Sequence, residues 1–356
     1  MLKCTHATSA SSRGLQANRE ELNLLISSFK PHIIALQETN IGSKHNISFQ
    51  NYSFYNCPGA ETNGIYRGGS ALIINKTIPH QPLNIQTNLQ AMAIRVTLFK
   101  VITVCSVYLP PSQRWDIKDL EELYSQLPPP AIILGDFNAH SQTWGCRDNN
   151  RHGKLVEDFI LKQNLSILNT GTSTYFHPGS GSLSAIDLSL CDPSLFLDLS
   201  WSVHDDLCGS DHFPILVRSS QKDDRDAVPS WKLDRADWHA FSDACSRELV
   251  IENTDTGDDS IESFSEKLLL IAADSIPKSK PGKRTVNTLW FNNDCKAAVR
   301  SRRKALKRAT VSPSSENMEN YRIIRAKSRR TIRSSRRQSW QTFVSKINSR
   351  TSLKKV

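Results

Sequence analysis

Acidic and polar side chains follow the ends of several short apolar runs in the first 220 residues. A group in that position lies at a sheet edge, at the mouth of a possible pocket. A lone carboxylate after a strand is more often a turn former or a helix cap, so only the whole set supports a functional interpretation. The five segments are Leu36-Gln37-Glu38-Thr39, Val107-Tyr108-Leu109-Pro110-Pro111, Leu134-Gly135-Asp136-Phe137-Asn138-Ala139-His140, Ser184-Ala185-Ile186-Asp187-Leu188 and Gly209-Ser210-Asp211-His212-Phe213-Pro214-Ile215.

Together these residue types could hold a divalent cation and activate a water for the hydrolysis of a phosphate ester. That reaction needs a hard divalent cation, an activated water and stabilisation of the extra negative charge. The carboxylate of Glu38 suits Mg²⁺, which binds few protein oxygens and keeps several waters. The imidazole of His212 can act as a base or, when protonated, can contact a phosphate.

The apolar patterns predict a mixture of buried strands and helices that could position such groups. Apolar residues at helical spacing predict helices over 18–29, 117–125 and 154–163. Continuous apolar runs predict buried strands at 33–36, 53–55, 70–74, 93–99, 102–108, 132–134 and 186–190. This mixture indicates an α/β or α+β sandwich with a central sheet core.

The charge is distributed very unevenly along the 356 residues, whose net charge is +10. Residues 1–224 contain 17 Lys and Arg against 20 Asp and Glu, residues 225–277 contain 5 against 12, and residues 278–356 contain 23 against 3. Helical spacing recurs over 235–250, 260–276, 295–310 and 315–348. We therefore expect a domain over 1–220, an acidic helical linker over 221–277 and a basic helical tail over 278–356.

Composition excludes several classes of protein. No apolar run approaches the roughly 18–20 residues of a membrane span, and the first residues lack the apolar core of a signal peptide. The eight cysteines form no C-x-x-C pair, so neither a zinc site nor a disulfide scaffold is indicated. Free thiols of this kind lead us to expect an intracellular protein, and the lack of a long apolar run leads us to expect no membrane partner.

The order and spacing of the five segments resemble the endonuclease/exonuclease/phosphatase superfamily, which has the deoxyribonuclease I and exonuclease III fold. The resemblance covers residues 7–218 and is strongest to the apurinic-endonuclease-like domain of jockey-like non-LTR retrotransposon polyproteins, through GDFNAHSQTWG, SAIDLSL and SDHFPI. It implies an α+β fold, a four-layer α/β sandwich with two packed central β-sheets, followed by a basic α-helical segment. The tail resembles the linker that precedes a reverse transcriptase, which is absent from this chain.

The resemblance also implies a role for each candidate residue. Glu38 becomes the principal ligand of Mg²⁺, with Mn²⁺ as the alternative cation, and Asp211 lies near the metal or the leaving group. Asp187 orients and charges His212, which contacts the scissile phosphate or serves as the base. The positions that orient the attacking water and contact the phosphate are Asp136, Asn138 and Tyr108. Taken singly, each has a plain structural interpretation, such as a core tyrosine, a turn cap or a packed histidine.

Two regions are candidates for nucleic-acid contact. The turn-rich segment 169–181 reads as a hairpin loop, and the matching loop in the family touches DNA near the nick; its candidates are Thr172 and Thr174. In the tail, arginines could neutralise phosphates without reading sequence; the candidates are Arg302, Arg303, Arg336 and Arg337. The alternatives are an ordinary exposed hairpin and a solvated helix face. DNA is the expected partner, element RNA is a second, and the basic runs point to the nucleus.

The start of the chain departs from the family pattern W-N-x-x-G-L. Gly14 and Leu15 keep its second half, whereas Ser11 stands where the family has Asn. Serine lacks the reach of a carboxamide, so we expect weakened nicking that Ser11→Asn partly restores.

The leading hypothesis is a Mg²⁺-dependent DNA endonuclease that nicks target DNA to prime reverse transcription. The alternatives are an impaired nucleic-acid-binding remnant and a phosphatase or sphingomyelinase of the same fold; the sequence leaves target site and oligomeric state open.

Overall fold

The computed structural model describes residues 2–4, 14–42, 45–220, 231–249, 258–278 and 290–347. Ser11 lies outside the described residues. The chain forms two compact units, of which one combines residues 1–221 with 286–356 and the other spans 222–285. Most of the basic segment therefore belongs to the compact unit of the first 221 residues.

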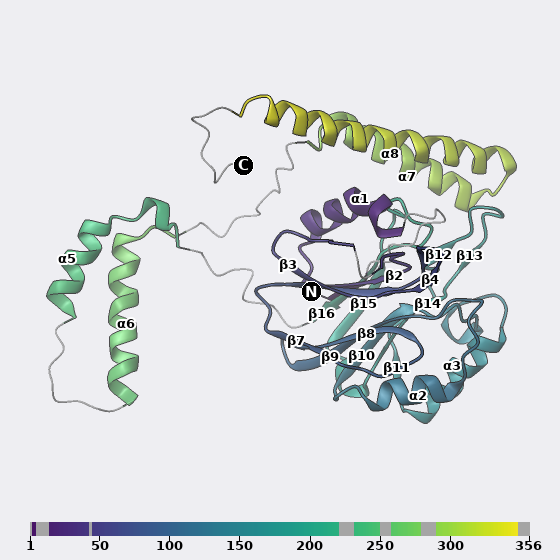
Figure 1. Ribbon diagram of the computed structural model, residues 1–356, viewed down its shortest axis with the longest axis horizontal. Helices are drawn as coiled ribbons and strands as arrows, with labels where there is room; N and C mark the ends of the chain where they lie inside the picture. The colour runs from purple at the N-terminus through teal and green to yellow at the C-terminus, as the bar shows by residue number, and fades with distance from the viewer. Residues whose placement is uncertain are drawn as a thin grey trace. The chain divides into compact units, whose positions relative to one another are not determined.

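Two six-stranded sheets form the centre of the larger unit (Figure 1). The first has the order β15-β16-β1-β2-β6-β3, with β1 Leu2–Cys4, β2 Ile33–Gln37, β3 Tyr52–Cys57, β6 Ser70–Asn75, β15 Leu199–Val203 and β16 Ile215–Ser219. The second has the order β11-β14-β10-β9-β8-β7, with β7 His80–Leu83, β8 Gln90–Thr97, β9 Val101–Tyr108, β10 Ala131–Asp136, β11 Ser166–Ile167 and β14 Asp187–Cys191. Two small hairpins complete the strands, namely β4 Ala60–Thr62 with β5 Ile65–Arg67, and β12 Tyr175–Phe176 with β13 Leu183–Ser184.

The two sheets pack face to face because their central strands are apolar on both sides. Ile33 and Leu72 of the first sheet share one buried cluster with Ile94, Val104 and Leu134 of the second. A strand that is covered on both faces needs no polar alternation, which explains the continuous apolar runs. This cluster is the middle of the sandwich.

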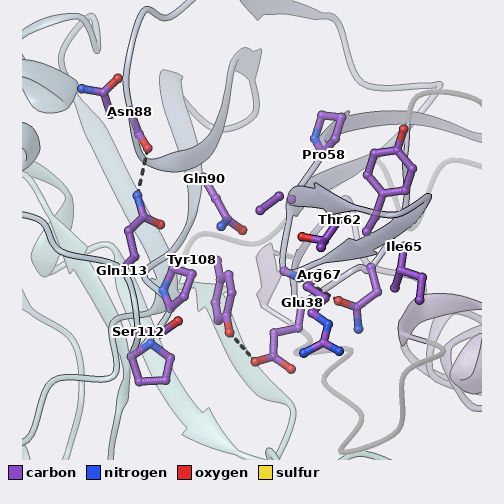
Figure 2. Close-up of a pocket in the computed structure, with 17 residues that line it drawn as sticks. Glu38, Pro58, Thr62, Ile65, Arg67, Asn88, Gln90, Tyr108, Ser112 and Gln113 are labelled. Atoms are coloured by element: carbon purple, nitrogen blue, oxygen red, sulfur yellow. Dashed lines mark hydrogen bonds between the residues drawn. The ribbon is translucent and has the colours of Figure 1, made fainter.

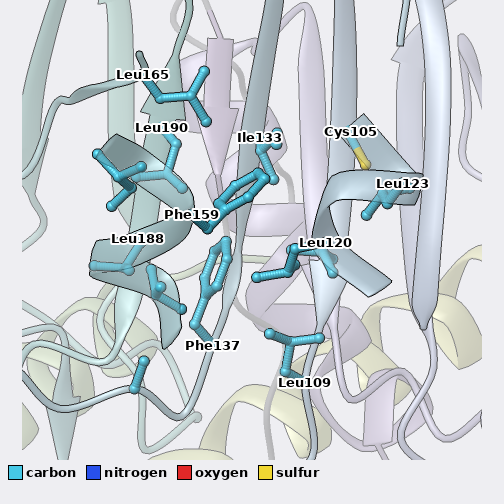
Figure 3. Close-up of a cluster of buried hydrophobic side chains, with 14 of the residues drawn as sticks. Cys105, Leu109, Leu120, Leu123, Ile133, Phe137, Phe159, Leu165, Leu188 and Leu190 are labelled. Atoms are coloured by element: carbon cyan, nitrogen blue, oxygen red, sulfur yellow. The ribbon is translucent and has the colours of Figure 1, made fainter. Parts of the chain in front are cut away.

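Helices cover the outer faces of both sheets. Helix α1 (Gly14–Phe29) covers the first sheet, and α2 (Ile117–Ser125) and α3 (Arg151–Lys162) cover the second (Figure 1). Figure 3 shows Leu120 and Leu123 of α2 and Phe159 of α3 packed with Ile133 and Leu188 of the second sheet. The arrangement of helix, sheet, sheet and helix confirms the predicted α+β fold of the deoxyribonuclease I type. Short α4 (Pro193–Phe196) and a 3₁₀ turn at Gln142–Trp144 complete the connections.

The amino-terminal part differs from expectation in two places. Strand β1 occupies a central position, pairing in parallel with β2 and antiparallel with β16, although it has only three residues. Helix α1 begins at Gly14, four residues earlier than the apolar spacing predicts. Gly14 has a φ of +45°, and a Cβ there would lie 2.2 Å from the carbonyl oxygen of Thr39. The Gly14-Leu15 pair is thus fixed beside the end of β2, where Glu38 follows.

The smaller unit contains two of the predicted helices, α5 (Trp238–Glu248) and α6 (Asp258–Ser275), with a 3₁₀ turn at Leu233–Arg235 before them. A bridge between Trp231 and Lys278 joins its two ends, and the Lys278 ammonium lies 4.0 Å from the Trp231 ring centroid. Within the described residues, no helix combines the length and apolarity that crossing a bilayer requires.

The basic segment of the larger unit forms a helical hairpin of α7 (Asn293–Val311) and α8 (Ser315–Val344). Asn292 and Ser314 cap these helices, each accepting a hydrogen bond from the backbone N–H three residues on. In α8 the buried residues recur at three- and four-residue spacing, so one face of a 30-residue helix is covered. They are Met318, Tyr321, Ser328 and Ile332.

Candidate active site

Four of the candidate residues lie at the ends of adjacent strands. In the second sheet, Asp136 at the end of β10 pairs in register with Tyr108 of the parallel strand β9 and with Asp187 of the antiparallel strand β14. Glu38 follows β2 in the first sheet, and its carboxylate accepts a hydrogen bond from the hydroxyl of Tyr108. The sequence separates these residues by up to 149 positions, and the sandwich brings them to one edge.

Buried polar side chains connect the two sheets directly beneath this edge. Gln37 Nε2 donates to Ser106 Oγ over 2.9 Å, and Ser70 Oγ donates to the Ser106 carbonyl oxygen over 2.8 Å. Glu38 adopts a φ of +49°, a left-handed conformation that is costly for a non-glycine residue. The strand therefore turns abruptly after Gln37, and these hydrogen bonds hold the turn that directs Glu38 toward Tyr108.

Asp187 and His212 form the predicted pair. His212 Nδ1 lies 2.9 Å from both carboxylate oxygens of Asp187, and both side chains are buried. Burial lowers the pKa of His212, but the negative charge of Asp187 and its hydrogen bond outweigh burial and raise the pKa to about 10. The imidazole therefore carries a positive charge at neutral pH.

Further carboxylates lie around the Asp187–His212 pair. Burial, followed by the charge of Asp187, raises the pKa of Asp136 well above its ordinary value. Burial also raises the pKa of Glu38, which the hydrogen bond from Tyr108 opposes. The ligand atoms of Asp136, Asp187 and His212 all lie within 4.8 Å of one another, a spacing that could hold a metal ion only if the imidazole of His212 lost its proton. A cation bound beside these carboxylates would favour their ionised form and so offset the effect of burial on their pKa values.

Asn138 and Asp211 complete the predicted set. Asn138 has a φ of +47°, its N–H donates to Asp136 Oδ1 over 3.0 Å, and its Nδ2 donates to the Leu109 carbonyl oxygen over 3.0 Å. Asp211 is buried beside His212, and its carbonyl oxygen accepts a hydrogen bond from Phe176 N–H over 2.8 Å. Asn138 thus fixes the turn after β10, and β12 fixes the backbone beside His212.

Tyr175 is a site neighbour that the sequence interpretation missed. Its ring centroid lies 4.6 Å from that of His212, and burial, followed by the charge of Asp211, raises its pKa to about 12. It occurs inside the turn-rich segment 169–181, where only threonines stood out. Aromatic residues are common in hairpins for packing reasons, so no sequence signal distinguished this one.

A cleft of about 950 Å³ extends from Glu38 and Tyr108 (Figure 2). The β4–β5 hairpin contributes Thr62, Ile65 and Arg67 to its wall. The opposite side includes Gln113, whose Nε2 donates to the Asn88 carbonyl oxygen over 3.0 Å, and Gln90. The carboxylate of Glu38 and the guanidinium of Arg67 therefore face the same open space.

The threonine candidates for nucleic-acid contact differ in exposure. Thr172 is exposed, with its hydroxyl 3.3 Å from that of Thr170. Thr174 is fully buried, and its Oγ1 accepts a hydrogen bond from Asp187 N–H over 3.2 Å. Thr174 therefore holds the backbone of Asp187, and Thr172 is left as the surface candidate of the two.

The four arginine candidates differ in their exposure and in their ion pairs. Arg302 is 1% exposed and forms ion pairs with Glu21 and Asp206. Arg303 pairs with Asp205 and Asp206, and Arg336 pairs with Glu20. Arg337 is exposed. Arg302 has no surface from which to reach a phosphate, whereas Arg337 does.

Comparisons with known proteins agree with this geometry. A model of the endonuclease-reverse transcriptase family matches residues 102–216. The RNA-directed DNA polymerase from mobile element jockey of Drosophila funebris is 28% identical over 307 residues, covering 82% of this chain and 32% of that protein. Its Drosophila melanogaster counterpart is 33% identical over 168 residues, covering 46% and 18%. The endonuclease domain of TRAS1, a telomere-specific non-LTR retrotransposon, has 19% identity and a TM-score of 0.52, covering 61% of this chain and 96% of that one.

The chain carries an endonuclease/exonuclease/phosphatase domain of the non-LTR retrotransposon kind. It spans a third or less of the length of the curated jockey relatives. Because the Drosophila funebris match covers 82% of the chain, the likeness continues past residue 220.

The donor set of this endonuclease/exonuclease/phosphatase domain fits a hard divalent cation. Carboxylate oxygens of Glu38 and Asp136 lie in a site where burial raises both pKa values. Gln37 precedes Glu38 in the sequence, and its buried Oε1 has no hydrogen-bond partner among the described residues. Oxygen ligands of this kind suit Mg²⁺ or Mn²⁺ better than softer metals. The chemistry of the residues present is therefore compatible with the metal that the resemblance implies.

Proposed function

We propose that the protein is a Mg²⁺-dependent DNA endonuclease that hydrolyses phosphodiester bonds and nicks target DNA. The observation that carries this proposal is the in-register row of Tyr108, Asp136 and Asp187, completed by the Asp187–His212 pair. A hydrolase of phosphodiesters needs a base, a cationic contact for the phosphate and a metal site. The row and its histidine supply candidates for the first two, and Glu38, hydrogen-bonded to Tyr108, supplies a carboxylate for the third.

The roles follow from the protonation state of each group. Asp136 retains protons readily and is placed to accept one from an attacking water. His212 is positively charged up to about pH 10 and would donate a hydrogen bond to a phosphate oxygen. Burial and the charge of Glu38 raise the pKa of Tyr108, so its hydroxyl remains a donor. Asn138 would position water and phosphate.

A bound Mg²⁺ would polarise the phosphate and neutralise part of its charge. Glu38 would be its principal ligand, with Asp211 near the metal or the leaving group. The cleft that begins at Glu38 and Tyr108 offers space for the nucleotides beside the scissile bond. The product would be a 3′-hydroxyl, which primes reverse transcription by another part of the element.

The remaining partners belong to the same proposal. Exposed Thr172 and Arg337 are the surface candidates for contact with DNA, and Arg337 also for element RNA. Such contacts would neutralise phosphates and would weaken with salt. A role on chromosomal DNA places the protein in the nucleus.

A catalytically impaired remnant is the second candidate function, and Ser11 favours it because the family has Asn there. The remnant would bind DNA without cutting it. A phosphatase or sphingomyelinase of the same fold is the third, and it would act on phosphate monoesters or phospholipid rather than on plasmid.

Conversion of supercoiled plasmid to open circles separates these functions. We expect the full chain to relax plasmid with Mg²⁺ and not with EDTA, and we expect Asp136→Ala and His212→Ala to bind DNA without relaxing it. Plasmid binding with no Mg²⁺-dependent relaxation by the unmodified chain would establish the remnant. Hydrolysis of sphingomyelin without relaxation would establish the phospholipid activity.

A further inference from the structure

The loop that carries Asp211 and His212 is held from outside by helix α8. Arg325 Nη2 donates to the carbonyl oxygens of Gly209 over 2.7 Å and of Ser210 over 3.1 Å. Ser210 Oγ in turn accepts a hydrogen bond from His212 N–H over 3.1 Å. Ser210 therefore links the guanidinium of Arg325, on the basic segment, to the backbone of His212.

The conformation of this loop requires outside support. Cys208 and Gly209 have φ values of +48° and +86°, and the left-handed region is unfavourable for cysteine. A Cβ on Gly209 would lie 3.2 Å from Asn18 Oδ1, which also accepts a hydrogen bond from Arg329 Nη2 over 2.8 Å. The loop is thus packed between α1 and α8, and it cannot hold this shape through local preferences alone.

Helix α7 holds the start of the same loop through a buried ion-pair network. The guanidinium of Arg302 contacts Asp206 Oδ2 over 2.7 Å and Asp206 Oδ1 over 3.2 Å, and it also pairs with Glu21 of α1. Burial opposes ionisation of Asp206, but Arg302 and then Arg303 outweigh it and lower the pKa of that carboxyl. The network joins α1, α7 and the loop, and every charge in it has a partner.

Apolar side chains on both sides of the catalytic residues also pack against the hairpin. Leu207 and Phe213 share a buried cluster with Leu306 of α7 and Tyr321 of α8. The Tyr321 ring packs edge-on against Phe176 of β12, with the centroids 5.7 Å apart. Strand β12 is the segment that hydrogen-bonds the Asp211 carbonyl oxygen, so the hairpin supports the site through two elements.

We infer that the α7–α8 hairpin is a positioning element of the active site, in which Arg325 and Arg302 hold the loop 205–213 so that His212 meets Asp187. The basic segment is then part of the nuclease itself, and its inward arginines act on the chemistry through the loop. The inference rests on the proposed function for its catalytic consequence, and its structural part stands on the contacts above.

The test compares Arg325→Met with Arg330→Met in the full chain. Arg330 lies on the same helix and is exposed, so the control removes the same charge and places the same side chain. Two readouts are taken: hydrogen–deuterium exchange of peptides covering 205–213, and the single-turnover nicking rate at saturating plasmid with Mg²⁺. The amides of Ser210, His212 and Phe213 all donate to acceptors in or beside the loop, so they report its opening.

We expect Arg325→Met to speed exchange of 205–213 by tenfold or more, with peptides of β9 and β10 unchanged. The nicking rate should fall about tenfold with plasmid affinity unchanged, and Arg325→Lys should recover part of both effects. Arg330→Met should match the unmodified chain. Arg302→Lys, which keeps the charge but loses the fork, should open the same peptides if Arg325→Met does not fold.

Unchanged exchange over 205–213 in Arg325→Met would overturn the inference, as would faster exchange spread evenly over the sheets. Faster loop exchange with an unchanged nicking rate would overturn it too, because the loop would then not govern the chemistry. If the unmodified chain does not nick, the proposed function fails, and the exchange comparison alone still decides whether the hairpin holds the loop.

Discussion

Two charged regions of the larger unit differ in how their charges are neutralised. At the strand ends, Glu38 and Asp136 lie near other carboxylates, and burial raises both pKa values. Under the helical hairpin, Arg302 is as buried as Asp136 but faces Glu21 and Asp206, and the pKa of Asp206 is lowered. The first region has a surplus of negative charge that a cation would relieve, and the second is balanced.

This difference teaches that the overall basic charge of the chain describes neither region. Removing one partner from a balanced buried network leaves an uncompensated charge and costs stability. Removing Asp136, a carboxylate beside Asp187 and Glu38, relieves repulsion between like charges and should harm the chemistry more than the stability. A substitution at the strand ends should therefore lower activity more than stability. A substitution in the network under the hairpin should lower the stability of the fold.

The largest effect is expected for Asp136→Asn, which removes the candidate base without changing side-chain volume. We expect the nicking rate to fall by about 10³-fold, within the range for loss of a general base, and thermal stability to rise or stay constant. Single-turnover plasmid nicking and thermal unfolding measure the two quantities. Exposed Asp148→Asn is the matched control. A strongly destabilised Asp136→Asn would contradict the surplus of negative charge.

Asp187→Asn should change the pH dependence of nicking. Asp187 outweighs burial to raise the pKa of His212 to about 10, so the unmodified rate should not fall on the alkaline side before pH 9. Without that carboxylate, burial should bring the pKa of His212 down, and the rate should decline at a lower pH than in the unmodified chain. At pH 8 we expect a loss of about 10²-fold. Identical alkaline limbs in both proteins would show that His212 is not the titrating group.

The raised pKa of His212 also makes the stability of the fold depend on pH. The stabilisation from charged His212 is complete below pH 6.5 and disappears as pH rises toward 10, since the folded pKa lies above the unfolded one. Asp187→Asn should remove this slope from the free energy of unfolding between those two pH values.

Arg302→Met should act in the opposite sense to Asp136→Asn. It leaves buried Glu21 without its ion-pair partner and Asp206 with Arg303 alone, and we expect a loss of about 3–5 kcal/mol in the free energy of unfolding. Adding Glu21→Gln and Asp206→Asn should recover most of it, because the two buried carboxylates then no longer carry an uncompensated charge. Chemical denaturation of the single and triple variants measures this. No recovery in the triple variant would show that packing, not charge balance, dominates.

A smaller effect is expected at Ser11, which lies outside the described residues. We expect Ser11→Asn to raise the nicking rate several-fold, since a carboxamide reaches farther than a hydroxyl and the resembling family has Asn at this position. Ser12→Asn is the control for a nearby amide. An unchanged rate in Ser11→Asn would reject the idea that this position impairs the enzyme.

The smallest effect is expected at Arg337, an exposed residue of α8. Arg337→Gln should weaken DNA binding about equally for all sequences and reduce the slope of log affinity against log salt by about one. Binding by fluorescence anisotropy at several salt concentrations measures it. A slope equal to that of the unmodified chain would remove Arg337 from the DNA interface.

Sequence predicted most of the sandwich because its central strands are buried on both faces and read as continuous apolar runs. It placed Glu38, Tyr108, Asp136 and Asp187 at strand ends, where the structure has them. Strand β1 was not predicted, since three residues held by neighbours on both sides show no pattern of their own. Tertiary pairing, not local preference, makes that strand.

The arginines of the tail show why the sequence could not tell structural arginines from those free to bind nucleic acid. Arg302 and Arg337 both belong to basic runs, yet one is buried in an ion-pair network and the other is exposed. The acidic partners Glu21 and Asp206 lie 281 and 96 positions away from Arg302. No local pattern reveals a partner at such separations, so the tail looked uniformly available to nucleic acid.

Binding of Mn²⁺ to the full chain, followed by electron paramagnetic resonance, tests the central claim most directly. The claim is that the surplus carboxylates at the strand ends hold a divalent cation. We predict one Mn²⁺ per chain that Mg²⁺ displaces, lost in Glu38→Gln and kept in Arg325→Met. Binding that persists unchanged in Glu38→Gln, or no binding by the unmodified chain, would contradict the account.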